Sequence, residues 1–234
     1  MAEEKNQSSI SFSTLLASSV HDMKNSVGTL LLSLRNILSE TPPQSAQQRA
    51  QFANLEYEAV RINNDLIQLL TLYRLDEKSI GVNIDEVRVM DVLEDQLARN
   101  ENLLAAKNIT CHLNCDKQLV WFLDAELIGS VINNLLANAS RYAAKQINLN
   151  VGLYHQFLKI EISDDGDGFP EFMLEIVGES NDGLPLNQAT GSTGLGLEFA
   201  RRILVLHCSN KDQGYIRLTN QGIKGGGKVE IYIP

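Results

Sequence analysis

Residues 124–143, DAELIGSVINNLLANASRYA, combine an apolar helical face with two asparagines spaced one turn apart. The apolar residues recur at steps of three and four, which predicts an amphipathic helix, and Asp124 is a residue type that caps helix N-termini. Asn134 and Asn138 are four positions apart and therefore lie on the same helix face. A lone asparagine would be an ordinary surface residue, so the meaning of this pair depends on the rest of the chain.

Two glycine clusters downstream of this helix have the composition of ligand-binding loops. In residues 162–170, ISDDGDGFP, a predicted strand ends at Asp164, and the glycines that follow allow a sharp turn beside a flat ligand. The carboxylate can accept a hydrogen bond from an exocyclic amine. Residues 191–203, GSTGLGLEFARRI, place glycines before a helix, where free N–H groups and the helix dipole favour phosphate. Either cluster alone is also typical of an ordinary turn.

The first 80 residues have the pattern of two long helices. Apolar spacing predicts a helix from Ser13 to Ser39, and TPPQS at 41–45 ends it because proline cannot continue the helical hydrogen bonds. A second helix is predicted from Ala46 to Asp76. Two such helices form an antiparallel hairpin with partly uncovered apolar stripes, so we expect a homodimer that builds a four-helix bundle. The coiled-coil repeat of the second helix comprises Phe52, Leu55, Ala59, Ile62, Leu66, Leu69 and Tyr73.

Beyond residue 80 short β-rich segments alternate with helical ones. This order predicts an α+β domain, an α/β sandwich with helices on one face of a mixed sheet. The chain is therefore divided into an N-terminal tail at 1–12, a helical hairpin at 13–78 and a second domain at 79–234. The helices of the second domain are predicted at 90–106, 124–142 and 194–206, and its strands within 81–89, 108–114, 118–123, 146–164 and 228–234.

The charge and hydropathy of the chain exclude several classes of protein. The 234 residues carry a net charge of −9 and no run of Lys and Arg, which argues against nucleic acid or an anionic membrane as partner. The N-terminus lacks the pattern of a signal peptide, and no apolar run approaches the roughly 18 residues that span a bilayer. We therefore expect a cytoplasmic protein without membrane insertion.

The cysteines and most histidines are predicted to be structural. CHLNC at 111–115 matches no common zinc spacing. An odd number of cysteines without an export signal favours reduced, mostly buried thiols, at Cys111, Cys115 and Cys208. No partner motif accompanies the histidines in predicted strands or at a helix end, which are His112, His155 and His207.

Taken together and in chain order, these motifs resemble those of the sensor histidine kinases of two-component systems. The resemblance implies a dimerisation and phosphoacceptor hairpin followed by a GHKL-type α/β sandwich that binds ATP, of the kind shared with gyrase, heat-shock chaperones and mismatch repair ATPases. It rests on NNLLANASRYA at 133–143 (N box), DDGDG at 164–168 and GSTGLGL at 191–197 (two glycine boxes), GGGKVEIYIP at 225–234, and HDMKN at 21–25 (H box).

The resemblance assigns ATP and Mg²⁺ as cofactors and implies a role for each motif residue. Asn138 is expected to ligate Mg²⁺, Asn134 to support the phosphates or the metal, and Asp164 to bind the adenine amino group. Arg141 and Tyr142 are expected along the nucleotide. Gly166 and Gly168 are expected to make room for the base, and the second glycine box to let a lid fold over the phosphates, through Gly191, Thr193, Gly194, Leu195, Gly196 and Leu197.

Asn134 separates this chain from the ATP-hydrolysing members of the wider group. Those proteins have a Glu one turn before the metal-binding Asn, where it acts as the base that activates water. An amide cannot take up a proton at neutral pH. We therefore expect slow hydrolysis, with the γ-phosphate kept for a protein nucleophile.

His21 is the predicted nucleophile. The apolar stripe of the first helix centres near Val20, and at about 100° per residue His21 points well away from it, toward solvent. Neutral imidazole can attack a γ-phosphoryl group, and Asp22 is expected to accept or stabilise the proton on the other ring nitrogen. In the family an acidic residue followed three positions later by Thr or Asn accompanies phosphatase activity. Asp22 and Asn25 form such a pair, so a bifunctional kinase and phosphatase is expected.

Two departures from the family pattern concern the mobile parts. Ser26 stands where many relatives have a proline that bends the helix, so a straighter helix is expected. Residues 175–192 lack the paired phenylalanines common before the second glycine box, and their Gly, Asn and Ser content predicts a mobile lid.

Few residues precede the first helix and no receiver domain follows Pro234. We therefore expect the input to come from a separate sensor or regulatory protein, from binding to the helical bundle, or from a region upstream of this sequence. The phosphoryl acceptor is expected to be an Asp on a separate response regulator. Two other functions stay open: a phosphotransfer or scaffold protein with an inactive ATP-like domain, and a serine kinase that acts on a protein partner.

Overall fold

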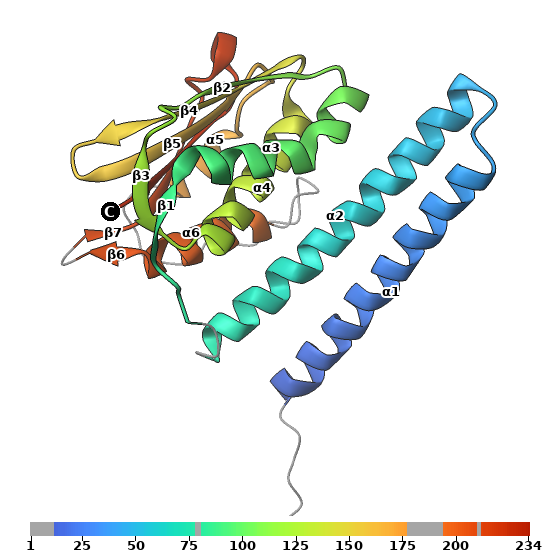
Figure 1. Ribbon diagram of the computed structural model, residues 1–234, viewed down its shortest axis with the longest axis horizontal. Coiled ribbons are helices and arrows are strands. Elements are labelled where there is room, and N and C mark those ends of the chain that lie inside the picture. Colours follow the sequence, from blue (N-terminus) through green and yellow to red (C-terminus); the bar gives the residue numbers. More distant parts are fainter. Residues whose placement is uncertain (1–11, 78–80, 177–193, 210–211) are drawn as a thin grey trace, which may run out of the picture. The chain divides into compact units, whose positions relative to one another are not determined.

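The chain folds into two units, Met1–Ile80 and Gly81–Pro234 (Figure 1). The computed structural model describes residues 12–77, 81–176, 194–209 and 212–234.

The first unit is a pair of long helices, α1 (Phe12–Glu40) and α2 (Ala46–Asp76). They run antiparallel and pack along their length (Figure 1). The hydroxyl of Ser45 caps α2 by accepting the N–H of Gln48 at 3.1 Å. Arg35 Nε donates to Glu56 Oε1 at 2.9 Å and joins the two helices near the turn.

Only part of the apolar surface of this hairpin is buried within it. Val20 and Leu34 on α1 and Ala59 and Leu72 on α2 are buried. Two heptad stripes stay 37–53% exposed, Met23, Leu30 and Ile37 on α1 and Leu55, Ile62 and Leu69 on α2. Every second residue of the predicted coiled-coil repeat on α2 therefore has an exposed side chain in a single chain.

The second unit is built on a five-stranded sheet of order β2-β4-β5-β9-β8, in which only β2 and β4 are parallel. Helices α3, α4 and α6 cover one face of it (Figure 1). This confirms the predicted mixed sheet with helices. Its elements are β1 (Asp85–Arg88), α3 (Val89–Ala106), β2 (Thr110–Asn114), β3 (Val120–Leu123), α4 (Ala125–Tyr142), β4 (Gln146–Tyr154), β5 (Phe157–Asp164), α5 (Glu171–Ile176), α6 (Leu195–Leu206), β6 (Cys208–Ser209), β7 (Asp212–Gln213), β8 (Tyr215–Thr219), a 3-10 turn (Ile223–Gly225) and β9 (Lys228–Ile233).

The core lies between the sheet and the helices. Strand residues alternate across the sheet, so one apolar set faces the helices along every central strand. This core rigidly supports the ends of α4, β5 and α6, where the candidate site residues lie. Its fully buried side chains include Ile147 and Leu149 of β4, Ile160 of β5, Ile128, Ile132 and Leu136 of α4, and Phe199, Ile203 and Leu204 of α6.

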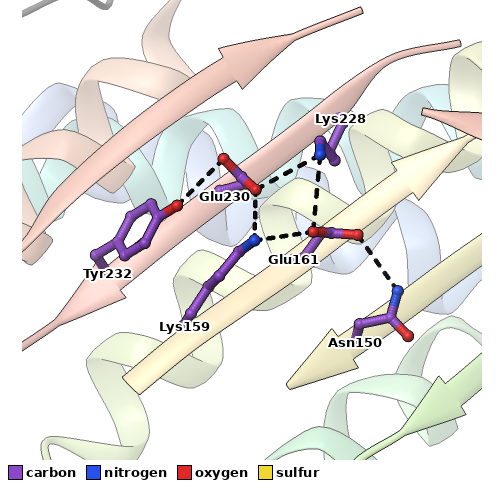
Figure 2. Close-up of polar contacts among 6 residues, drawn as sticks. All are labelled: Asn150, Lys159, Glu161, Lys228, Glu230 and Tyr232. Carbon is purple, nitrogen blue, oxygen red and sulfur yellow. Dashed lines mark hydrogen bonds and ion pairs between the residues drawn. The ribbon is translucent and has the colours of Figure 1, made fainter. Parts of the chain in front are cut away.

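The opposite face of the sheet carries a network of charges (Figure 2). Lys159 Nζ lies 2.6 Å from Glu230 Oε1 and 3.1 Å from Glu161 Oε2, which joins β5 to β9. Lys228 Nζ lies 3.6 Å from the same Glu230 oxygen, and the hydroxyl of Tyr232 donates to Glu230 Oε2 at 3.2 Å. Burial opposes the charge on Glu230, but these donors and cations hold the pKa of its carboxyl below its ordinary value.

Three sequence predictions about this unit were incomplete or wrong. Strand β8 was missed because Tyr215 and Arg217 point outward from an edge strand and weaken its apolar pattern. His155 was placed in a strand, but it has a positive φ of 52° and lies in the turn between β4 and β5. The cysteines are free as expected, but none of the three is buried: Cys111 and Cys115 are partly exposed and Cys208, on the short β6, is exposed.

Candidate functional site

Helix α4 carries four of the predicted nucleotide-site residues on its second half. Asp124 caps it, because its Oδ1 accepts the N–H groups of Glu126 and Leu127 at 3.1 and 2.9 Å. Asn138 is exposed, whereas Asn134, one turn earlier, is buried. At the end of the helix the Arg141 guanidinium lies 5.4 Å from the centre of the half-exposed Tyr142 ring. The helix thus offers one accessible and one buried amide.

Asn134 joins α4 to the second glycine box. Its Nδ2 donates to the carbonyl oxygen of Gly196 at 2.9 Å. A Cβ on Gly196 would lie 2.6 Å from Asn134 Oδ1, so only glycine allows this approach. Gly194 precedes α6 with a φ of +66°, a conformation that favours glycine. The buried amide therefore holds the first turn of α6 in place.

The start of α6 is suited to phosphate. It is a 12-residue helix, and the dipole at a helix N-terminus favours an anion. Glu198 in the first turn is paired with Arg201 and Arg202 at 2.8 and 3.0 Å, which offsets its negative charge. Leu197 is buried in the core, so only its backbone could contact a ligand.

Other residues of this box fall outside the described part of the chain. Gly191 and Thr193 lie there, as do most of the residues 175–192 predicted to form a lid.

Asp164 ends β5 with a buried carboxylate. Its Oδ1 accepts the N–H groups of Gly166 and Gly227 at 2.9 and 3.3 Å. Within the described residues no hydrogen bond reaches Oδ2, which stays available as an acceptor. Burial raises the pKa of Asp164, the two N–H donors oppose that rise, and the neighbouring Asp165 adds to it.

Gly166 and Gly168 were expected to make room for the base, but the structure shows that they are needed for packing within the protein. A Cβ on Gly166 would lie 2.2 Å from the carbonyl oxygen of Tyr142, so this glycine lets the loop touch the end of α4. Gly168 has a φ of +79°, and a Cβ there would lie 2.7 Å from Asn220 Oδ1. Both glycines fit the loop against the protein's own atoms.

Sequence reasoning missed two residues that hold this loop. Asp165 Oδ1 accepts three consecutive backbone N–H groups, those of residues 144–146, at 2.9 to 3.0 Å. Burial slightly opposes its charge, but these donors lower the pKa of its carboxyl. Asn220, after β8, hydrogen-bonds both backbone groups of Phe169. The second Asp of the DDG motif was the only indication in the sequence that Asp165 has a role. Nothing in the sequence indicated a role for Asn220.

The predicted phosphoacceptor His21 lies on the outer face of α1, with 54% of its side chain exposed. Asn25 Nδ2 lies 3.3 Å from His21 Nδ1, and Asp22 Oδ1 lies 3.7 Å from the same nitrogen. Both predicted helpers therefore face Nδ1. The other ring nitrogen, Nε2, makes no hydrogen bond among the described residues.

Ser26 makes a contact that proline could not. Its hydroxyl donates to the carbonyl oxygen of Asp22 at 2.9 Å, and the hydroxyl of Thr29 repeats the pattern on Asn25 at 3.0 Å. Helix α1 runs without a break through this turn. Hydrogen bonds from a hydroxyl to a carbonyl of the preceding turn can bend a helix slightly. Replacing proline by Ser26 therefore does not by itself make α1 an ideal straight helix.

The described part of the chain contains neither a cluster of metal-ligating side chains nor a helix that could span a membrane. In the ranges that the structure describes, no set of three or more His, Cys, Asp or Glu side chains could hold a metal ion. No helix in the same ranges is both long and apolar enough to cross a membrane.

The chain is similar to several known proteins in sequence and in fold. Residues 123–234 match the family described as histidine kinase-, DNA gyrase B-, and HSP90-like ATPase. The chain is 27% identical to a putative sensor histidine kinase NtrY-like protein of Rickettsia bellii, over 96% of this chain and 36% of that protein. It is 28% identical to the adaptive-response sensory kinase SasA of Synechocystis, over 82% of this chain and 53% of the relative. The chain thus spans about a third to a half of these relatives.

Solved structures share the fold. The histidine kinase AdeS of Acinetobacter baumannii superposes with a TM-score of 0.58 at 20% identity, over 91% of this chain and 96% of that one. Full-length ShkA in complex with AMPPNP gives a TM-score of 0.64 at 16% identity, over 94% of this chain and 45% of that one.

Proposed function

We propose that this chain uses ATP to phosphorylate itself on His21. Its residues 123–234 match the histidine kinase-, DNA gyrase B-, and HSP90-like ATPase family, and the chain is similar to sensor histidine kinases. The phosphoryl group then passes to an Asp of a separate response regulator. The observation that carries the proposal is the exposed His21 with Asp22 and Asn25 both at its Nδ1.

The adenine end of the site is proposed at Asp164. Its Oδ2 is an acceptor without a hydrogen bond among the described residues, and the exocyclic amine of adenine is a matching donor. The loop that follows is held by the protein's own contacts, so little ordering is needed when a base binds. Tyr142 and Arg141 would flank the nucleotide from the end of α4.

The phosphates are proposed between Asn138 and the start of α6. The exposed amide oxygen of Asn138 is a hard ligand of the kind Mg²⁺ accepts, with the phosphates and water completing the set. When bound, Mg²⁺ supplies charge neutralisation of the triphosphate. Because Asn134 is engaged with Gly196 and cannot act as a base, we propose that water attack is slow.

Transfer to His21 is proposed as an in-line displacement. The Nε2 lone pair forms a bond to the γ-phosphorus while the bond to the bridging oxygen breaks, and ADP leaves with that electron pair. For Nε2 to be the nucleophile, Nδ1 must carry the proton. Asp22 can accept that proton as the ring becomes acidic. In this tautomer a flipped Asn25 amide would face Nδ1–H with its oxygen, a contact that the transfer does not require.

The same two residues support a phosphatase function. Asn25 is exposed beside His21, where its amide can orient a water molecule toward a phospho-Asp brought to this face by the regulator. We therefore propose that the enzyme is bifunctional, a kinase and a phosphatase.

A homodimer is proposed from the uncovered apolar stripes of the hairpin. Three residues per helix recur every seven positions and stay about half exposed in one chain. A second hairpin would cover both stripes and complete a four-helix bundle.

The test is incubation of the full chain with γ-labelled ATP and Mg²⁺. Wild type should gain a label that is acid-labile and base-stable, and His21→Gln should lose it. His112→Gln, which removes another exposed imidazole, is the matched control and should keep the label. Label that survives His21→Gln rejects the proposed acceptor, and absence of label in wild type with normal nucleotide binding favours the scaffold alternative.

A further inference from the structure

The loop Asp164–Phe169 is held at both ends by one segment of the chain, residues 220–227. At the first end the N–H of Asp164 donates to the carbonyl oxygen of Gly227 at 2.9 Å, and the N–H of Gly227 donates to Asp164 Oδ1 at 3.3 Å. At the second end Asn220 binds Phe169. The backbone bonds at the first end continue the pairing of β5 with β9, whereas the second end depends on one side chain.

Asn220 acts toward Phe169 as a neighbouring strand would. The N–H of Phe169 donates to Asn220 Oδ1 at 2.6 Å, and Asn220 Nδ2 donates to the carbonyl oxygen of Phe169 at 2.9 Å. A carboxamide carries a donor and an acceptor in one plane, so it can satisfy both backbone groups of a single residue. No other residue type except glutamine offers this pair, and glutamine is one carbon longer.

The loop between these two ends needs such a restraint. Gly166 and Gly168 give it more backbone freedom than other residues would, and Gly168 holds a φ of +79°. Asp165 restrains its first half through the N–H groups of residues 144–146. Asn220 restrains the second half and packs against Gly168.

We propose that Asn220 is a positioning residue for the nucleotide, which sets the conformation of the loop Asp164–Phe169 before ATP binds. This inference rests on the proposed function, in which Asp164 binds adenine. Without the Asn220–Phe169 pair the loop populates other conformations, and the apparent affinity falls by the fraction of molecules that stay competent to bind. Asn220 itself does not touch the nucleotide.

The test compares variants of the full chain by direct binding of a non-hydrolysable ATP analogue and by autophosphorylation kinetics. Asn220→Ala should weaken analogue binding and raise the KM for ATP by about fivefold, since two hydrogen bonds are lost, while kcat stays within about twofold. Asn220→Asp keeps the acceptor for the Phe169 N–H, so its analogue affinity and its KM for ATP should lie between those of wild type and Asn220→Ala. Gln221→Ala, at the next exposed position, is the control and should match wild type.

The split between KM and kcat separates positioning from simple destabilisation. A variant that merely unfolds in part loses active molecules, which lowers kcat and leaves KM unchanged. If Asn220→Ala binds the analogue like wild type while Asp164→Asn binds it weakly, the inference is overturned and the adenine contact stands. If Asp164→Asn binds like wild type, the adenine contact is wrong and the inference is overturned with it.

Discussion

Asn134 Nδ2 donates to the carbonyl oxygen of Gly196 at 2.9 Å and so ties α4 to the first turn of α6. The same two helices are joined again at their other ends, where the N–H of Asp124 donates to His207 Nε2 at 3.1 Å. These two contacts hold α4 and α6 together as an antiparallel pair.

The close approach at Gly196 predicts a non-additive pair of substitutions. Asn134→Ala should lower the free energy of unfolding by about 1–2 kcal/mol, because the hydrogen bond from the buried Asn134 side chain to the Gly196 carbonyl is lost. Gly196→Ala should also destabilise, since its Cβ would lie 2.6 Å from Asn134 Oδ1. In the double variant the new methyl finds space, and Ala favours a helix, so the combined loss should be about 1 kcal/mol smaller than the sum. Urea unfolding measures all three, and additive losses would contradict the close contact.

The sequence predicted helices α4 and α6 but not the hydrogen bond between Asn134 and Gly196 that joins them. Helix periodicity and the capping Asp124 predicted α4, and the glycines before Leu195 predicted the start of α6, because both signals are local. The contacts of Asn134 with Gly196 and of Asn220 with Phe169 join residues 62 and 51 positions apart. Only the folded sheet brings such residues together, so the glycines were assigned to the ligand rather than to these neighbours.

Asn25 gives a prediction that separates the two proposed activities. Asn25→Ala should autophosphorylate like wild type, because Asp22 still faces Nδ1 of His21 at 3.7 Å. Dephosphorylation of the regulator should fall by about tenfold or more, because the amide that orients water is lost. Label decay on a purified phosphorylated regulator measures it. Asn36→Ala, another exposed asparagine on α1, should behave as wild type. Unchanged decay with Asn25→Ala would refute the assignment.

Ile62 lies in the middle of the uncovered stripe on α2 and is 46% exposed in a single chain. Ile62→Lys should turn a micromolar dimer into monomer, because a symmetric interface would bury two unpaired ammonium groups, each costing several kcal/mol. Sedimentation velocity on the full chain measures the change. Asn54→Lys adds the same charge at an exposed polar position of α2 and should stay dimeric. A monomeric wild type, or a dimeric Ile62→Lys, contradicts the bundle.

Glu230 predicts sensitivity to acid. It is 5% exposed and contacts Lys159, Lys228 and Tyr232 (Figure 2). Because its pKa is lowered in the folded state, its stabilisation is present above the ordinary value of 4.5 and is lost as pH falls through the folded pKa. Glu230→Gln should cost about 2 kcal/mol at pH 7, since charged hydrogen bonds are lost, and should show a weaker fall in stability below pH 4.5. Glu86→Gln, at an exposed site on β1, is the control.

His207 predicts a loss of stability at milder acidity. It is 2% exposed, its Nδ1 lies 2.9 Å from the carbonyl oxygen of Ile203, and its Nε2 accepts the N–H of Asp124. The Nδ1–H tautomer satisfies both bonds, and a protonated ring would lose the second. Burial lowers the pKa of His207, against the opposing effects of Ile203 and Asp124.

The sign of the pH dependence follows from that shift. Below the ordinary value of 6.5 the unfolded chain takes up a proton that the folded chain does not, so stability falls as pH drops from 6.5 toward the folded pKa. The slope should approach about 1.4 kcal/mol per pH unit for this one proton. His207→Gln, whose amide oxygen can still accept the Asp124 N–H, should reduce the slope between pH 6.5 and 5, and His112→Gln should not. Urea unfolding across this range decides it, and equal slopes for the two variants would place the titration elsewhere.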